Sequence, residues 1–327
     1  MSVVKNKLGT VCVGLAAVTA TLVQVRPPAV NTTVETNRAE WSDRMPLSDR
    51  SLLLDVTVIG SRVIAVGDRG HVLVSEDGGS KWTQARVPTR SMLTAVTMVD
   101  EQHSWVVGHD AVILASSNGG RDWVLQHLAP EWDLPLLDVW FANASHGIAV
   151  GASGLLLETH DGGRSWTRRT ISQQEPHLYA ITEGRDGTLY IAGESGSLYR
   201  SRDSGRSWTA LTSPYSGSFF GAIALSDGAL LIFGLRGNLY RSEDQGQTWR
   251  RLETSTTASL MGGVEQTDRT VVIVGLSGTV LVSTDRGHEF FLSNRRDRLG
   301  LANAAELSGG RLLTVGEAGI GQIDKLR

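Results

Sequence analysis

The chain of 327 residues contains a single cysteine, Cys12, which lies within an uncharged N-terminal run. The rest of the chain therefore has no thiol for a disulfide, a metal site or nucleophilic catalysis. Proline is also scarce, at 8 residues, whereas glycine is abundant, at 37. Together with a hydrophobic content of 41%, this composition is typical of many short, tightly turned strands and not of a disordered chain.

Lysine is scarce as well, and nearly all the positive charge comes from arginine. The formal net charge is −3, and beyond the N-terminal segment the only lysines are Lys81 and Lys325. No long basic stripe is present, which argues against nucleic-acid binding. The eight histidines are scattered without a His-x-x-x-His pair, so the sequence predicts neither a metal site nor a bound cofactor.

The N-terminal segment has the pattern of a targeting sequence. Lys5 and Lys7 precede an uncharged run over residues 8–25, and the run is about as long as the shortest bilayer span. Residues 1–26 are therefore predicted to be either a cleaved signal peptide or an anchor in the inner membrane. In both cases residues 27–39 form a polar tether, and the body of the protein is expected in the periplasm.

A motif of the form Gly-x-x-Gly, which follows a short apolar run, recurs along the chain. Its first glycines are Gly67, Gly108, Gly151, Gly193, Gly234, Gly275 and Gly316. The spacing of 41 to 43 residues, combined with strand-like patterning, is the signature of propeller blades. Residues 40–327 are therefore predicted to form an all-β, seven-bladed β-propeller.

A second motif, Ser-x-Asp-x-Gly-x-x-Trp, follows each of the first six glycine motifs. This is the Asp box, or BNR repeat, and its acidic and aromatic positions are Asp77 and Trp82, Asn118 and Trp123, Asp161 and Trp166, Asp203 and Trp208, Asp244 and Trp249, and Asp285 and Phe290. The acid is expected to accept backbone N–H bonds in a hairpin, and the aromatic ring to pack on the sheet. These residues are thus predicted to be structural, and Trp166→Ala is expected to cost about 3–5 kcal/mol if Trp166 is buried.

The last repeat offers only three strands before the chain ends, at residues 301–307, 311–315 and 320–324. The segment from Trp41 to Pro46 lies 41 residues before Trp82 and resembles its surroundings. The N-terminal strand is therefore expected to complete blade seven, which would remove an open sheet edge.

The pairing of glycine turns with Asp boxes carries a resemblance to a known family. Val66-Gly67-Asp-Arg-Gly70, followed by Ser75-Glu-Asp-Gly-Gly-Ser-Lys-Trp82, resembles the photosystem II stability/assembly-factor family of BNR-repeat propellers. The resemblance implies a non-catalytic scaffold outside the cytoplasm that serves a membrane protein complex or transporter. The propeller is expected to be monomeric. Members of the family use a patch of arginines, which has no residue-by-residue match in this chain.

Loops at one end of a propeller are the usual place for a binding site. The loops between the second and third strands of each blade, and those between blades, are expected to open on one face. Arginine and aromatic residues are favoured at protein interfaces. The candidate binding residues are Arg69, Arg236, Trp132, Tyr215, His109 and Arg90.

The alternative function is that of a BNR-repeat glycoside hydrolase, because Asp boxes also occur in sialidases and in glucan-cleaving propellers. Such an enzyme needs two carboxylates at a suitable separation with unequal pKa values. Asp110, Asp133 and Glu194 are the candidates for that role. Against this alternative, the early arginine motif of sialidases is missing from the sequence.

Overall fold

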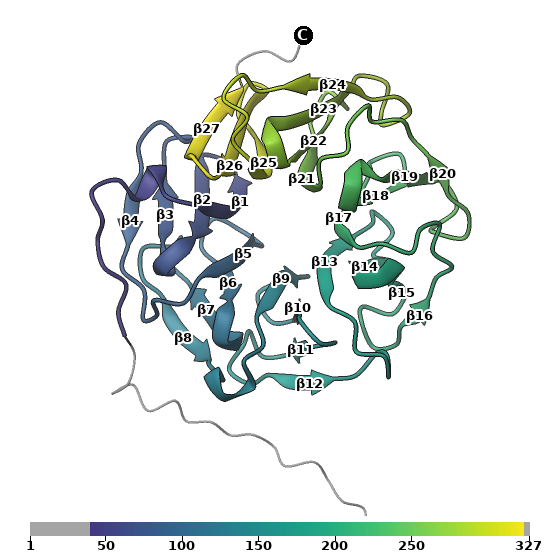
Figure 1. Ribbon diagram of the computed structural model, residues 1–327. Helices are drawn as coiled ribbons and strands as arrows, with labels where there is room; N and C mark the ends of the chain where they lie inside the picture. The colour runs from purple at the N-terminus through teal and green to yellow at the C-terminus, as the bar shows by residue number, and fades with distance from the viewer. Residues whose placement is uncertain (1–39, 324–327) are drawn as a thin grey trace, which may run out of the picture. The chain divides into compact units, whose positions relative to one another are not determined.

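The computed structural model describes residues 40–323, which form seven antiparallel sheets arranged in a ring (Figure 1). The seven-bladed propeller predicted from the repeats is confirmed. The predicted leader and tether, residues 1–39, lie outside the described residues. Within residues 40–323, no helix is long and apolar enough to cross a membrane.

Six blades have four strands each, and the seventh has three. Blade 1 holds β1 (Leu53–Ile59), β2 (Arg62–Gly67), β3 (Val72–Ser75) and β4 (Thr83–Ala85); blade 2 holds β5 (Leu93–Met98), β6 (Ser104–Gly108), β7 (Ile113–Ser116) and β8 (Val124–His127); blade 3 holds β9 (Leu136–Phe141), β10 (Gly147–Gly151), β11 (Leu156–Thr159) and β12 (Thr167–Arg169). Blade 4 holds β13 (Leu178–Glu183), β14 (Leu189–Gly193), β15 (Leu198–Ser201) and β16 (Thr209–Ala210); blade 5 holds β17 (Phe219–Ala224), β18 (Leu230–Gly234), β19 (Leu239–Ser242) and β20 (Arg250–Arg251). Blade 6 holds β21 (Leu260–Glu265), β22 (Val271–Gly275), β23 (Thr279–Ser283) and β24 (Phe291–Asn294), and blade 7 holds β25 (Leu301–Leu307), β26 (Arg311–Gly316) and β27 (Gly319–Ile323).

Short 3-10 turns join the strands on one face of the ring. They are η2 (Ser48–Arg50), η3 (Asp68–Gly70), η4 (His109–Ala111), η5 (Pro130–Trp132), η6 (Glu194–Gly196), η7 (Leu235–Gly237) and η8 (Leu276–Gly278).

The Gly-x-x-Gly motif is explained by two different constraints. A Cβ atom on Gly67 would lie 2.2 Å from the carbonyl oxygen of Leu52, so the innermost strand leaves no room for a side chain there. Gly70, the second glycine, has a φ of +70°, a conformation that favours glycine. Blade 2 departs from the motif, because buried Ala111 takes this second position with a φ of 51°.

Each Asp box closes the hairpin between the third and fourth strands of its blade. In blade 1, Asp77 Oδ1 accepts hydrogen bonds from the backbone N–H groups of Ser80 and Lys81, at 3.1 and 2.8 Å. Ser75 Oγ donates to the same carboxylate at 2.9 Å and accepts from the N–H of Gly79 at 2.9 Å. The box is therefore a self-contained turn whose polar groups are satisfied locally.

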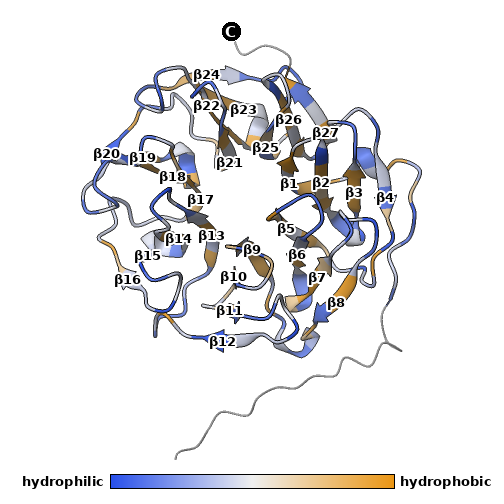
Figure 2. Ribbon diagram, turned by 180° about the vertical axis from the view of Figure 1, so that it is seen from behind, coloured by the Kyte–Doolittle hydropathy of each residue, from blue (hydrophilic) through white to orange (hydrophobic). Residues whose placement is uncertain are grey.

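The aromatic residue of each box packs against the preceding blade. Trp123 of blade 2 joins a cluster that includes Ile64 and Val74 of blade 1, and Trp82 of blade 1 packs against a cluster that includes Leu307 of blade 7. Trp123 is 4% exposed and fully packed, whereas the other box aromatics are half-buried. Figure 2 shows apolar residues gathered in the strands and polar residues in the loops.

The prediction that the segment from Trp41 to Pro46 forms the fourth strand of blade 7 is wrong. This segment is not a strand, and it lies beside the outer strand of blade 1. Ser42 N–H donates to the carbonyl of Val87 at 2.9 Å, and Met45 N–H donates to Gln84 Oε1 at 2.8 Å. The backbone donors that a ladder with β27 would use are therefore engaged in blade 1 instead.

The ring closes through side chains and one turn. Asn303 of blade 7 donates its side-chain amide to Asp55 Oδ1 of blade 1 at 2.6 Å, and the apolar cluster around Leu53 and Leu313 spans both blades. The turn η2 contacts β27, as Figure 1 shows where the first and last blades meet. Residues 48–50 thus occupy the place that an interblade loop fills elsewhere.

Candidate binding face

One face of the ring carries the 3-10 turns and the connections between blades. Both kinds of loop lie at the same ends of the strands, and they contact each other. Ala129 N–H donates to the carbonyl of Asp110, and Gly154 N–H donates to the carbonyl of Pro176, both at 2.9 Å. This surface is called the turn face below, and the opposite surface, with the Asp boxes, is called the box face.

The tips of the turns share one backbone conformation but differ in chemistry. The tip residues with positive φ are Arg69, Asp110, Ser153, Ser195, Arg236 and Ser277, with φ between 49° and 59°. Because the same geometry recurs in six blades, it belongs to the fold. A rigid ring that displays different side chains at equivalent places is suited to recognition by loops.

Arg69 and Arg236, the leading predicted contacts, both lie at such tips and are exposed. The side chain of Arg69 is 71% exposed and forms an ion pair with Asp68 at 3.3 Å, which is weak because solvent screens it. Among residues 40–323, no ion pair involves Arg236. Both guanidinium groups are thus available to a partner.

The two predicted aromatic contacts are less exposed than an interface residue would be. Trp132 in η5 is half-buried, with its ring 5.3 Å from the His127 ring and the Arg168 guanidinium 5.7 Å from its centroid. Tyr215 is half-buried against Tyr240, at a centroid distance of 6.5 Å. Both rings are therefore partly covered by side chains of the propeller itself.

The remaining two predicted residues differ in their surroundings. His109 is exposed in η4 on the turn face. Arg90 is also exposed, but its Nε donates to the Trp41 carbonyl at 3.1 Å and it pairs with Asp43 at 3.3 Å. Arg90 therefore holds the N-terminal segment on blade 1.

The turn face is divided by charge. The loops of blades 2 to 4 on this face contain five acidic residues and no lysine or arginine: Asp110, Glu131, Asp133, Glu175 and Glu194. From blade 5 round to blade 1 the loops carry exposed arginines together with acids. The arginines are Arg236, Arg296, Arg298, Arg50 and Arg69, and the acids are Glu253, Asp297, Glu317, Asp49 and Asp68. A partner that lies across the ring thus meets an acidic arc on one side and an arc of mixed charge, which contains the exposed arginines, on the other.

The three acids considered for glycoside cleavage lie in different loops of the acidic arc. Asp110 accepts a hydrogen bond from Ser91 Oγ at 2.6 Å, and Glu194 accepts one from the N–H of His177 at 3.3 Å. Asp133 is exposed at the end of η5. Within residues 40–323, no hydrogen bond joins any two of the three.

Two further carboxylates, which the sequence did not single out, lie in the centre of the ring. The innermost strand of each blade contains a bulge, and the residue after it lines a central cavity of about 170 Å³. Asp55 occupies this position in blade 1, and Asp138 occupies it in blade 3. Asp55 accepts from the N–H of Val96 in blade 2, and Asp138 from the N–H of Ile181 in blade 4, both at 2.8 Å. Each carboxylate thus joins its own blade to the next.

Burial raises the pKa of both central carboxyls. The pKa of Asp55 rises to about 6, although hydrogen bonds from Val96, Asn303 and Val56 oppose the rise. The pKa of Asp138 rises to about 7 because burial acts together with the charge of Asp55. The alternation of Asp, Ala, Asp and Ala after the bulges of blades 1 to 4 is the sequence signal that marks this position.

Comparison with known proteins places this geometry in a family context. The family described as photosynthesis system II assembly factor YCF48 matches residues 125–271. The solved structure of YCF48 bound to D1 peptide is similar with a TM-score of 0.71 and 17% identity, and the likeness covers 88% of this chain and 97% of that one. Residues 125–271 thus resemble the photosystem II assembly factors, and the chain shares the propeller fold of YCF48.

Other solved structures share the propeller fold. YCF48 from Cyanidioschyzon merolae matches with a TM-score of 0.67 and 18% identity over 86% of this chain and 97% of that one. Streptogramin B lyase matches with a TM-score of 0.73 and 12% identity over 86% of this chain and 96% of that one. No curated protein matches the sequence. Since an enzyme shares the ring of this assembly-factor-like propeller, the fold alone does not decide between binding and catalysis.

Proposed function

We propose that this assembly-factor-like propeller is a non-catalytic, monomeric scaffold that binds a segment of a membrane-protein complex or transporter outside the cytoplasm. The observation that carries the proposal is its likeness in fold to YCF48 bound to D1 peptide, together with the family match over residues 125–271. By analogy with that complex, we expect the ring of this protein to bind a peptide segment of a membrane protein.

The charge pattern of the turn face supports this role. Complementary charge steers a partner and fixes its orientation on a surface. A segment whose acidic end meets Arg236 and Arg69, and whose basic end meets Glu131 and Asp133, would fit both arcs. The expected ligand is therefore an extended peptide segment with unequal charge along its length.

The carboxylates support binding and not hydrolysis. Asp110, Asp133 and Glu194 lie in separate loops, as described above. Asp55 and Asp138 have raised pKa values, but their oxygens accept backbone N–H groups of two blades. These two acids act as interblade links.

The proposed location rests on the sequence pattern of residues 1–26, and residues 27–39 would serve as the link to the propeller. A tagged protein crosslinked in membranes and purified for mass spectrometry tests the proposal. Recovery of one membrane complex is the expected result. A preparation without any membrane protein would contradict the proposal and direct attention to a panel of glycosides.

The double variant Arg69→Glu with Arg236→Glu is expected to abolish capture of that complex. Both side chains are exposed at turn tips, so reversing their charge leaves the core unchanged and stability within about 0.5 kcal/mol. The expected loss of affinity is at least tenfold, because like charges would face the acidic part of the partner. Capture is measured by the same purification, and folding by thermal denaturation.

The matched control reverses two exposed arginines on the box face, Arg185 and Arg286. Arg185→Glu with Arg286→Glu changes the net charge by the same amount and is expected to leave capture unchanged. Equal loss in both double variants would indicate a general effect of charge and would move the binding site away from the turn face.

A further inference from the structure

The hairpin of β10 and β11 in blade 3 brings two histidines and a glutamate together on the box face. Gly147 pairs with Thr159 and Ile148 pairs with Glu158, so this register continues to place His146 opposite His160. Glu158 and His160 are two residues apart and therefore point to the same side of the strand. Residues separated by up to 14 positions in sequence thus form one cluster.

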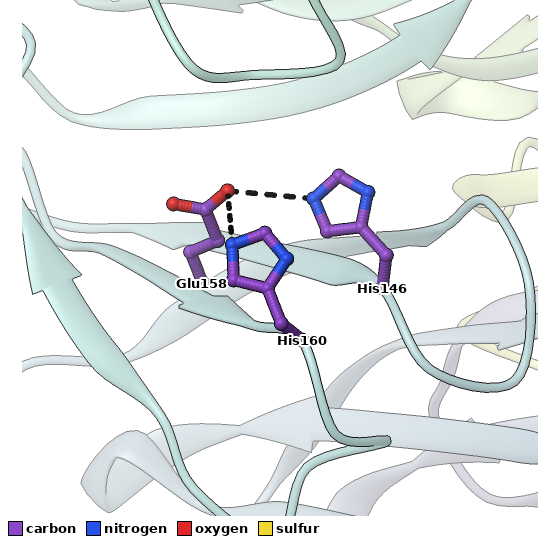
Figure 3. A group of neighbouring side chains, drawn as sticks. All are labelled: His146, Glu158 and His160. Carbon is purple, nitrogen blue, oxygen red and sulfur yellow. Dashed lines mark hydrogen bonds and ion pairs between the residues drawn. The ribbon is translucent and has the colours of Figure 1, made fainter.

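The polar atoms of this cluster point toward one another (Figure 3). His146 Nε2 lies 3.4 Å from Glu158 Oε1, and His160 Nε2 lies 3.2 Å from the same oxygen. With metal–ligand bonds of about 2.1 Å, neighbouring ligand atoms of a tetrahedral site are about 3.4 Å apart. Both separations are therefore close to the edge length of such a site.

The surroundings hold two of the three groups in place. The side chain of Glu158 is 3% exposed, and its Oε2 accepts a hydrogen bond from Arg169 Nη1 at 2.5 Å, which leaves Oε1 directed at the imidazoles. The ring of His146 packs edge-on against Trp140 at 5.6 Å. A hydrogen bond to a ligating carboxylate is the kind of support that metal ligands receive in proteins.

The third group is free to adjust. The side chain of His160 is 67% exposed, and its ring stacks on that of His146 with centroids 4.7 Å apart. All three ligand atoms lie within 4.8 Å of one another, so a tilt of the His160 ring brings its nitrogen into position. The same exposure gives an ion access to the site from solvent.

The fold itself does not require these residues. The register of the other blades places different residues at the positions of His146, Glu158 and His160: Arg62, Val74 and Glu76; His103, Ala115 and Ser117; Thr188, Arg200 and Arg202; Ala229, Arg241 and Glu243; Thr270, Val282 and Thr284. Five blades fold without the cluster. The combination in blade 3 is therefore an added feature of this hairpin.

We propose that His146, Glu158 and His160 bind one divalent transition-metal ion, with Zn²⁺ as the preferred class. Imidazole nitrogen and carboxylate oxygen suit Zn²⁺, whereas Mg²⁺ and Ca²⁺ prefer oxygen ligands alone. Three protein ligands leave a fourth position for water or for a group from a partner. The arrangement thus provides a metal-dependent contact point on the box face, separate from the turn face.

Isothermal titration of Zn²⁺ into the untagged, chelator-treated full chain tests the site. A Cys12→Ser background removes the only thiol. One ion per chain is expected, with a rise in melting temperature of about 5 °C at a free Zn²⁺ concentration 100 times the dissociation constant. His146→Ala and His160→Ala are each expected to weaken binding by at least tenfold and to remove the temperature shift.

The control is His103→Ala, which removes the histidine at the equivalent position in blade 2, where it pairs with Asp100. This variant is expected to bind Zn²⁺ as the parent does. Mg²⁺ is expected to give no shift. Absence of binding in the parent protein would overturn the proposal, as would equal affinity in the parent and the His160→Ala variant.

Discussion

Replacing Trp123 by alanine is expected to lower the free energy of unfolding by about 3–5 kcal/mol. Trp123 is 4% exposed and packs in the cluster that joins blades 1 and 2. Its Nε1 donates to the carbonyl of Gly120 at 2.8 Å, so the substitution removes a hydrogen bond in addition to the packed ring. Chemical denaturation followed by fluorescence or circular dichroism measures the loss.

Trp166→Ala is the matched comparison from blade 3. Trp166 is half-buried, and its Nε1 is buried without a hydrogen-bond partner among residues 40–323. The substitution also removes a buried N–H donor that has no acceptor, and this gain in free energy offsets part of the packing energy that is lost. The loss is expected to be clearly smaller than for Trp123, and below the 3–5 kcal/mol that full burial would imply. Equal losses would contradict the packing difference between the two blades.

Much of the fold follows from the sequence because each repeat records a local constraint. A glycine recurs at the position of Gly67 in every blade, because a backbone carbonyl oxygen would clash with a Cβ atom there. The acid at the position of Asp77 recurs because its carboxylate accepts the hydrogen bonds that close the hairpin. Constraints of this kind act within a single blade. They are therefore visible as a period in one sequence, without any knowledge of how the blades meet.

The features that the sequence did not reveal depend on contacts between distant segments. The segment after Trp41 resembles the surroundings of Trp82, but its direction is decided by Gln84 and Val87, which bind its backbone. The resemblance between the two sequences did not show against which blade the segment would pack. The ring is consequently closed by packing and by the Asn303–Asp55 hydrogen bond, and not by a shared strand.

The candidate sites differ in how far the sequence locates them. Arg69 and Arg236 were located correctly on the turn face, since their place follows from the order of strands. The cluster of His146, Glu158 and His160 has no short sequence motif, because it depends on the pairing register of a hairpin. Once the ends of β10 and β11 are known, the pairing of 146 with 160 follows by counting.

The pH dependence of stability is expected to differ between the parent protein and an Asp138→Asn variant. The pKa of Asp138 is raised from 3.8 to about 7 in the folded state, so between these values the folded chain binds a proton that the unfolded chain releases. The stabilisation is therefore complete below about pH 4 and is lost as pH rises to about 7. The loss is at most about 1.4 kcal/mol per pH unit.

Comparison with the variant is needed because other groups act in the opposite direction. Burial lowers the pKa of His71, His127 and His146, and these residues favour folding increasingly as pH rises toward 6.5. Subtracting the variant's curve cancels their contribution. Melting temperatures from pH 4.5 to 8 should therefore show the parent losing stability relative to Asp138→Asn until about pH 7.

Asp133→Asn is the control for this experiment, since Asp133 is exposed at the end of η5. Its curve is expected to run parallel to that of the parent protein. If Asp138→Asn also ran parallel, the Asp138 carboxylate would be ionised over the whole range, and its hydrogen bonds from Val139 and Ile181 would outweigh burial. If the parent instead loses stability relative to Asp138→Asn as pH rises toward 7, the acid that links blades 3 and 4 is protonated below that pH.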